Sequence, residues 1–286
     1  MTRGRNSVRA TNNRRIYYLS ILIAMVWIGG PAAFALSPMG SPTSGLEQED
    51  FKIGVDYSHS KMDLEFNDGK YVEYLDGWFD ASGAESDLKL KDIKINAVYA
   101  NLGYGVTDNL EIFLRLGGTN AKFGGSTFWP SGDEFDSNTN FAIGGGIKAT
   151  FYEEGKLKVG GLIQADWSEL DGAIRPKEWP VADDTVQFDL TQVQIAAGPS
   201  YELTEKVLIY GGPFLHFVCG NWQDVYNQFD PAGLLTSKKS WNVEQESYFG
   251  AYIGTQMEIA ENSTFLIEYQ QTASAYAVGT SIAVRF

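Results

Sequence analysis

The chain has 286 residues, of which 14% are aromatic, and its 22 basic and 36 acidic residues give a formal net charge of −14. That length suits one large domain, and so acidic a chain repels phosphate backbones, which argues against nucleic-acid binding. The single cysteine, Cys219, cannot form an internal disulfide, so the chain is not a small disulfide scaffold.

The first 35 residues have the features of a secretory signal peptide. Residues 1–15 carry five arginines and no acid, an apolar run spans 16–28, and Ala33-Phe34-Ala35 supplies the small residues of a cleavage site. An N-terminal anchor is the alternative, but 13 apolar residues are too few for a membrane helix, which needs about 20. We therefore expect cleavage after Ala35, which leaves 17 basic and 36 acidic residues, a net charge of −19.

The rest of the chain is predicted to be all-β. Residues 36–50 are rich in Ser, Pro and Gly and predict a flexible periplasmic lead-in to one domain at 51–286. In that domain apolar and polar residues alternate, as in 110–116, with the period of a strand that has two different faces. We expect strands near 51–59, 92–105, 109–119, 140–152, 156–168, 186–201, 206–219, 246–260, 263–272 and 275–286.

Three segments fit this pattern least well. Strand 92–105 has apolar residues in both phases, and in strand 186–201 the phase changes between Leu190 and Val193, which predicts a bulge. Residues 62–74 suggest a hairpin around Asn67-Asp68-Gly69, interpreted as an extension above the membrane. Strand counts of eight or twelve therefore remain alternatives to ten.

The connections favour a closed antiparallel transmembrane barrel. Short turns are expected at 107–109, 153–155, 203–205 and 261–262, and long segments at about 60–91, 120–139, 169–185 and 220–245. Short periplasmic turns that alternate with long external loops are typical of bacterial outer-membrane barrels. Aromatic residues near the strand ends predict a girdle at each membrane interface. These are Tyr104, Phe151, Tyr201 and Phe286 on the periplasmic side, and Tyr57, Phe141, Trp167, Phe217 and Tyr276 on the outer side.

The last strand resembles the C-terminal strand of bacterial outer-membrane proteins. It carries Tyr276, Gly279, Ile282 and Val284 in an alternating pattern and ends in Phe286, although position 282 is often aromatic in such strands. Residues 99–111 are similar to the strand–turn–strand of small porin-like and OmpA-type barrels. The resemblance implies recognition by the outer-membrane assembly machinery and contact with outer-membrane lipid and lipopolysaccharide, and it identifies a superfamily without a specific member.

Charged residues on the inward phase predict a filled lumen. Because an unpaired buried charge is costly, and a narrow barrel is nearly filled by side chains, we expect these groups to form an ion-pair network. The ten residues are Lys52, Asp56, Glu111, Arg115, Lys148, Lys158, Asp166, Glu258, Glu268 and Arg285.

Chemical motifs are scarce. His216 falls on an inward phase, where Asp189, Asp166 or Glu246 could approach it as in omptin-like proteases, but none of that family's local catalytic motifs is present. A hydrogen-bonded lumen histidine is the favoured interpretation. No catalytic residues are assigned, and no metal or cofactor is expected.

Tryptophans are concentrated in the predicted loops. Because exposed tryptophan is costly unless it packs or binds, they either cover the barrel mouth or bind a surface glycan or protein ligand. They are Trp78, Trp129, Trp179, Trp222 and Trp241. The sequence thus favours a non-enzymatic structural or surface-binding barrel, with a narrow pore for small solutes or hydrophobic molecules, or a barrel protease or lipid-modifying enzyme, as alternatives.

Overall fold

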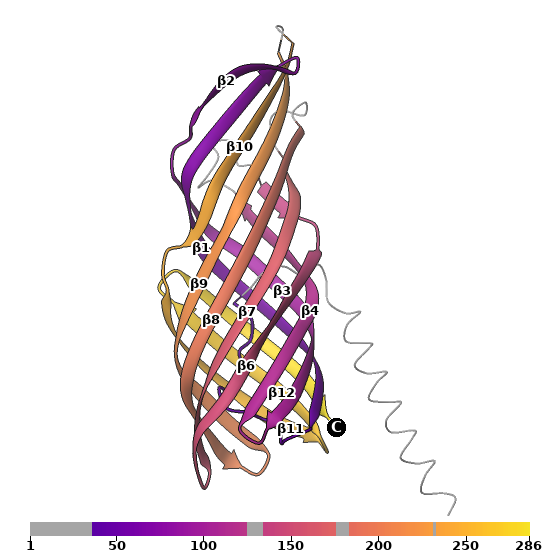
Figure 1. The fold of residues 1–286 in the computed structure, drawn as a ribbon, viewed down its shortest axis with the longest axis vertical. Helices are drawn as coiled ribbons and strands as arrows, with labels where there is room; N and C mark the ends of the chain where they lie inside the picture. The colour runs from indigo at the N-terminus through magenta and orange to yellow at the C-terminus, as the bar shows by residue number, and fades with distance from the viewer. Residues whose placement is uncertain (1–35, 125–133, 176–182, 231–232) are drawn as a thin grey trace, which may run out of the picture. The chain divides into compact units, whose positions relative to one another are not determined.

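A computed structural model describes residues 36–124, 134–175, 183–230 and 233–286, so the predicted signal peptide lies outside the described residues. The described residues form an antiparallel β-structure (Figure 1). Among them, no helix has the length and apolar character needed to cross a membrane.

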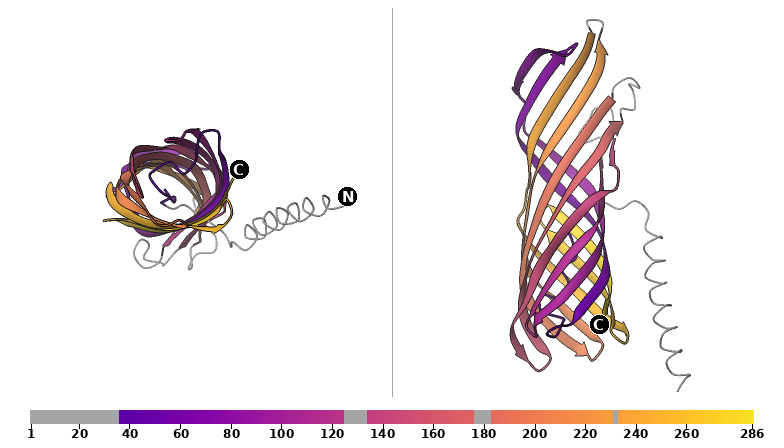
Figure 2. Two further views of the ribbon diagram at one scale, coloured as in Figure 1. Left: turned by 90° about the horizontal axis from the view of Figure 1, so that it is seen from below. Right: turned by 45° about the vertical axis from the view of Figure 1, so that its right-hand side comes forward.

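Ten strands pair in a closed ring in the lower part of the barrel, seen along its axis in Figure 2. The four predicted short turns join strands at one end of this ring, and the ten-stranded closed barrel predicted from the sequence is confirmed. The strands are β1 (Phe51–Leu75), β3 (Leu88–Thr107), β4 (Leu110–Gly124), β6 (Asn140–Glu154), β7 (Leu157–Arg175), β8 (Asp183–Thr204), β9 (Val207–Asp230), β11 (Phe249–Ala260), β12 (Ser263–Thr272) and β13 (Ala275–Arg285).

Above this ring the barrel continues with fewer strands. β6, β11, β12 and β13 end, while β5 (Glu134–Ser137) bridges β4 and β7, and β10 (Gly233–Gln245) bridges β9 and β1. Within the described residues this closes a second ring of eight strands, β1, β3, β4, β5, β7, β8, β9 and β10. β2 (Trp78–Ala84) pairs with the far end of β1. The long connections expected as loops therefore consist largely of β-structure.

The two rings differ in which face of their strands is apolar. In the lower ring the outward face is apolar, and in the upper ring the inward face is. In β1, Asp56 and Ser58 face inward and Ile53 and Tyr57 face outward, but beyond Ser60 the inward residues are apolar and the outward ones charged. Inward Met62, Leu64 and Phe66 are fully buried beside outward Lys61, Asp63 and Glu65. The lower ring thus has the apolar exterior of a membrane barrel, and the upper ring has the apolar interior of a protein surrounded by water.

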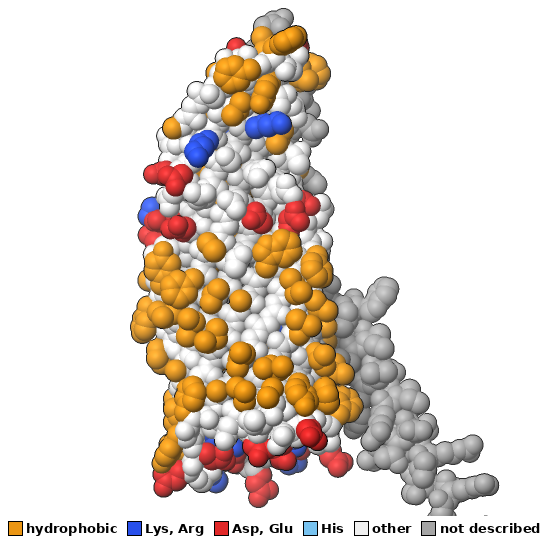
Figure 3. Space-filling model, viewed as in Figure 1, with side chains coloured by type: hydrophobic (Ala, Val, Ile, Leu, Met, Phe, Trp, Pro, Cys, Tyr) orange, Lys and Arg blue, Asp and Glu red, His pale blue; other side chains and the backbone are white. Residues whose placement is uncertain are grey.

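Figure 3 shows the resulting apolar belt, with acidic side chains below and above it on the face drawn. Large apolar residues of this belt are exposed around the lower ring, including Leu114, Ile163, Ile195, Ile253 and Ile267. Of the nine predicted girdle aromatics, eight are exposed, and Tyr104 is half-buried with its ring centroid 4.9 Å from that of Phe51.

Two details of the sequence prediction are wrong. β8 has no bulge between Leu190 and Val193, because its pairing with β7 runs without a shift from Thr185 to Tyr201. The apparent change of phase is the inversion of polarity at the membrane boundary, which also explains the apolar residues in both phases of β3. Residues 62–74 do not turn at Asn67-Asp68-Gly69. β1 passes through with a bulge, and the turn lies at Asp76-Gly77.

Candidate functional site

Residues 36–46, called here the plug, lie inside the lower ring (Figure 2, the indigo segment within the ring). Nearly all of this segment is buried, with Leu36 and Met39 at 0% and 1% exposure. The structure thus differs from the flexible periplasmic lead-in that the composition of residues 36–50 predicts. The Ser, Pro and Gly residues of the plug have small side chains, so the segment fits into a narrow lumen.

Side-chain amides and a guanidinium hold the inner end of the plug. The carbonyl oxygen of Ser37 accepts hydrogen bonds from Gln270 Nε2 at 2.8 Å and Gln164 Nε2 at 3.3 Å. The Arg115 guanidinium donates to the carbonyl oxygen of Pro38. These barrel side chains thereby replace the water that would otherwise solvate the buried backbone of the plug.

Carboxylates bind the backbone amides of the plug. The N–H groups of Met39 and Gly40 each donate at 2.9 Å to one oxygen of the buried Glu268 carboxylate. Nearer the periplasmic end, Gly45 N–H donates to Glu111 Oε2 at 3.1 Å. The plug is thus attached to the barrel at two separate levels of the lumen. Both attachments are strong, because hydrogen bonds to charged acceptors are stronger than those between neutral groups.

Six of the ten residues predicted as a lumen network are buried in the lower ring. Arg115 Nε lies 3.3 Å from Asp56 Oδ2, and Arg115 Nη1 lies 3.9 Å from Asp166 Oδ2. Glu111 forms an ion pair with Lys52, which is half-buried. Gly144 leaves the space that Asp166 occupies, because a Cβ there would lie 1.9 Å from Asp166 Oδ1. The buried six are Asp56, Glu111, Arg115, Lys148, Asp166 and Glu268.

The other predicted network residues lie nearer the periplasmic rim. Lys158 forms an ion pair with Glu153 at 3.0 Å, Arg285 lies 3.8 Å from Asp50, and Glu258 is exposed. A cavity of about 390 Å³ lies beside the plug at this end, and Lys52, Lys148, Glu258 and Arg285 are among its lining residues. The cavity therefore extends from this rim along the plug as far as Asp56 and Arg115.

A polar layer lies above the plug. His216 is fully buried and its Nε2 is 3.0 Å from Gln192 Oε1, while Gln194 Nε2 donates to Gln270 Oε1 at 2.8 Å. Asp189 and Glu246, two proposed partners of His216, lie on the outward phase, where Asp189 is half-buried and Glu246 exposed, and Asp166 lies beside Arg115. Within the described residues, His216 therefore has no carboxylate partner of the kind a general base needs.

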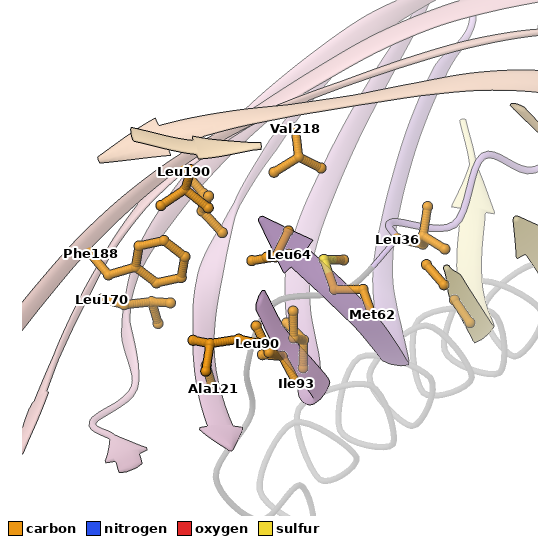
Figure 4. Close-up of a cluster of buried hydrophobic side chains, with 14 of the residues drawn as sticks. Leu36, Met62, Leu64, Leu90, Ile93, Ala121, Leu170, Phe188, Leu190 and Val218 are labelled. Atoms are coloured by element: carbon orange, nitrogen blue, oxygen red, sulfur yellow. The ribbon is translucent and has the colours of Figure 1, made fainter. Parts of the chain in front are cut away.

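The upper ring is filled by an apolar cluster, part of which Figure 4 shows around Phe188, Leu64 and Ile93. The Trp222 ring lies 5.3 Å from that of Phe188, 5.4 Å from Phe66 and 5.6 Å from Phe123, measured between centroids. Trp222 and Trp241, predicted as loop residues for ligand binding, are buried in this cluster. Trp78 is exposed near the tip, and Trp129 and Trp179 lie outside the described residues.

Charged pairs cover the outside of the upper ring. Lys89 on β3 contacts Glu65 on β1 and lies 3.3 Å from Glu246. Hydrogen bonds to Glu65 and then Glu246 raise the pKa of Lys89 above its ordinary value. A surface of this kind belongs in water, which places this part of the barrel outside the bilayer.

The predicted assembly-signal residues lie on β13, except Phe286, which directly follows it. Tyr276 and Phe286 are exposed on the outward phase, while Ile282 and Val284 are half-buried. Gly279 faces the plug, and a Cβ there would lie 2.6 Å from Pro38 Cγ. The closing strand therefore also forms part of the plug's binding site, which the sequence pattern did not indicate.

No family model and no curated protein matches the chain. Among solved structures, it is similar to the outer membrane protease OmpT of Escherichia coli, at 12% identity and a TM-score of 0.42 over 82% of this chain and 96% of that one. It is similar to the translocator domain of autotransporter NalP from Neisseria meningitidis, at 9% identity and a TM-score of 0.42 over 98% and 97%. An outer membrane channel from Pseudomonas putida F1 matches at 11% identity and a TM-score of 0.41 over 88% and 100%.

The closed ring, its apolar belt and its short turns at one end identify the architecture. The chain folds as a closed antiparallel transmembrane β-barrel. Two features stand out in this barrel: its two stacked rings and the plug in its lower lumen.

Proposed function

We propose that this outer-membrane barrel is a closed, non-enzymatic anchor that presents its upper ring at the cell surface for recognition of a glycan or protein. The observation that carries the proposal is the double occlusion of the lumen. The plug crosses the lumen of the lower ring, and an aromatic cluster that includes Phe66, Phe188 and Trp222 fills the upper one. Eight-stranded barrels are just wide enough for side chains to fill, which agrees with this closure.

A narrow pore for small or hydrophobic solutes is less well supported. A solute on the axis would have to displace the buried carboxylate contacts of Met39 and Gly40 and then pass the apolar cluster. A barrel enzyme is also less well supported, because the buried His216 side chain contacts Gln192. In this proposal outer-membrane lipid and lipopolysaccharide cover the belt, and the assembly machinery recognises β13.

The contact surface in this proposal is the tip of the upper ring. Trp78 and Phe79 on β2 and Phe229 near the end of β9 are 81%, 65% and 73% exposed. They lie far from the lipid-facing belt, at the end where Figure 3 shows a second group of apolar side chains. Exposed aromatic residues at such a site are suited to stacking on sugar rings or filling a pocket in a protein partner.

Conductance tests the closure. We expect the mature protein in planar bilayers to show no steady current, and the variant lacking residues 36–46 to remain closed because the upper cluster is intact. A stable current should appear only when that deletion is combined with Phe188→Ala and Trp222→Ala, which empties both levels. A stable open conductance of the unaltered protein would refute the closed anchor and favour the pore.

Adhesion tests the tip. Bacteria that display Trp78→Ala/Phe79→Ala/Phe229→Ala should lose binding to immobilised glycans or host-surface proteins that retain cells displaying the parent barrel, by about tenfold or more for a set of central aromatic contacts. Tyr152→Ala is the control, since Tyr152 is exposed near the opposite end. Equal retention of parent and triple-variant cells would remove the tip from the proposal.

A further inference from the structure

Lys148 on β6 is a buried cation without a charged partner in the described part of the chain. The residue is 8% exposed, and its side chain lies inside the lower ring beside the plug. Its ammonium forms no ion pair or hydrogen bond with any described residue, and the Phe113 ring, 5.7 Å from Nζ, offers only a cation–π contact. Because a buried ammonium without a charged partner is costly, this position indicates a partner from outside the chain.

Two carboxylates of the lumen wall already have donors of their own. Glu111 lies directly opposite Lys148 in the register of β4 and β6, but it forms an ion pair with Lys52 and accepts a backbone N–H of the plug. Glu268 accepts two further N–H groups of the plug, one of them from Gly40. Both carboxylates repel a doubly charged ion more strongly than a singly charged one. The space beside Lys148 therefore favours a monoanion.

A cavity connects Lys148 with the periplasmic end of the barrel. Its volume is about 390 Å³, and its lining extends from Arg115 and Lys148 at the inner end to the turn residues Glu205 and Lys206. Both turn residues are exposed, so the cavity opens at the periplasmic rim. Sites for small molecules commonly have volumes of about 300–1,000 Å³, so this one has room for a compact organic molecule.

Apolar side chains lie close to the ammonium. A Cβ on Gly40 would lie 2.9 Å from Lys148 Nζ and 3.4 Å from Leu266 Cδ1, so the lysine and the leucine border the same point of the plug. Leu208, two residues beyond Lys206 on β9, lines the same cavity. A cation at the inner end and leucines along the wall are suited to a ligand that has one anionic group and an apolar body.

We infer that this cavity binds a small organic acid from the periplasm, with its carboxylate on Lys148 and its apolar body against Leu266 and Leu208. The site lies at the opposite end of the barrel from the tip, so it is independent of the surface role proposed above. The bound acid does not pass through the barrel, because the aromatic cluster of the upper ring lies beyond it. The barrel thereby holds a ligand on its periplasmic side while it remains closed.

Ligand-observed NMR tests the site with probes of matched size. The exported protein in lipid nanodiscs is titrated with hexanoate, 1-hexanol or inorganic phosphate, and the signal from empty nanodiscs is subtracted. We expect saturable binding of hexanoate and at least about tenfold weaker binding of the alcohol, which lacks the charge-assisted hydrogen bond. Phosphate should not bind. Hexanoate binding no tighter than that of hexanol, or phosphate binding as tight as that of hexanoate, would overturn the inference.

Lys148→Met locates the binding. Methionine retains an apolar chain but removes the ammonium, so hexanoate should bind at least about tenfold more weakly. Lys158→Met is the matched control and should bind hexanoate as the parent does, because Lys158 is paired with Glu153 and does not line this cavity. Equal affinity of the parent and Lys148→Met would contradict the inference and leave Lys148 as a hydrated lysine.

The stability of the ligand-free protein tests whether Lys148 lacks a partner within the chain. The urea midpoint of Lys148→Met should be no lower than that of Lys158→Met, because no buried ion pair is broken. A much lower midpoint, or failure to fold, would show that the barrel itself supplies the partner.

Leu208→Trp tests the cavity without a change at Lys148. The larger side chain should fill part of the cavity and weaken hexanoate binding several-fold. Ile209→Trp, on the lipid-facing side of the same strand, should leave the affinity unchanged. Equal affinity of these two variants would place the binding outside the cavity.

Discussion

At the residue scale, the plug is positioned by a few contacts that leave no room for extra atoms. Gly279 on β13 lies against Pro38, and Glu268 on β12 binds the next two backbone amides. Close packing of this kind makes an interior sensitive to a single added methyl group. The plug should therefore respond to substitutions on the barrel wall that do not alter its own sequence.

Gly279→Ala should displace the plug, because the new Cβ would lie 2.6 Å from Pro38 Cγ, well inside van der Waals contact. We expect a loss of roughly 1–3 kcal/mol in the free energy of unfolding and faster proteolysis within residues 36–50. Gly45→Ala is the matched control, since the nearest atom to its Cβ is Glu111 Oε2 at 3.8 Å. Equal proteolysis of the two variants would show that the Pro38 contact does not hold the plug.

At the scale of the element, each long strand serves two environments without a change of phase. On β8 the outward residues are Ile195 and Val193 in the belt and Asp189 and Gln187 above it, whereas the inward ones change from Gln194 to Phe188. The pairing register with β7 stays constant throughout. Polarity along one face of a strand therefore locates the membrane boundary near residues 190–192.

Arginine substitutions on one face of β8 test this boundary. Ile195→Arg places a charge against lipid and should lower the free energy of unfolding in phospholipid vesicles by about 2–4 kcal/mol, the cost of a midplane arginine. Gln187→Arg, on the same outward phase but beyond the belt, should change it by no more than about 0.5 kcal/mol. Urea titration monitored by tryptophan fluorescence measures both. A similar cost at the two positions would place the boundary elsewhere.

At the scale of the whole described barrel, two closed rings of different strand number share six continuous strands. Each ring nevertheless has its own interior. The lower interior is a polar lumen sealed by the plug, and the upper interior is an apolar cluster. Lipid supports only the lower ring, so the upper one depends on its own core, as a small water-soluble barrel does. Loss of that core should therefore leave the membrane part folded.

Phe188→Ala tests this independence. Phe188 is 1% exposed and contacts the Phe66 and Trp222 rings, so its truncation should cost about 3–5 kcal/mol in the stability of the upper ring. We expect faster amide exchange in β10 and in the outer half of β9, with β11 to β13 unchanged. Phe217→Ala, which removes a lipid-facing ring from β9, should leave exchange in β10 unaltered. Equally faster exchange in all strands would show a single cooperative unit.

Much of the barrel followed from local pattern. Alternation, short turns and terminal aromatics predicted ten strands, their ring and the lipid-facing surface, because each depends on the period of two along a strand. The inward phase likewise located Asp56, Glu111, Arg115 and Glu268 in the lumen. Their partners were less predictable, because Met39, Gly40 and Gly45 contribute only backbone amides and those leave no trace in residue type.

The sequence by itself determined the fold class and which faces of the lower ring meet lipid, and it favoured ten strands over eight or twelve, since these are set by polarity within about ten consecutive residues. Only the tertiary structure decided that the predicted lead-in is a plug, that Trp222 and Trp241 form a core, and that the expected loops close a second ring. These features depend on contacts between residues as far apart as Met39 and Glu268. A local pattern cannot specify such pairs, because any inward position of a closed ring faces several others across the lumen.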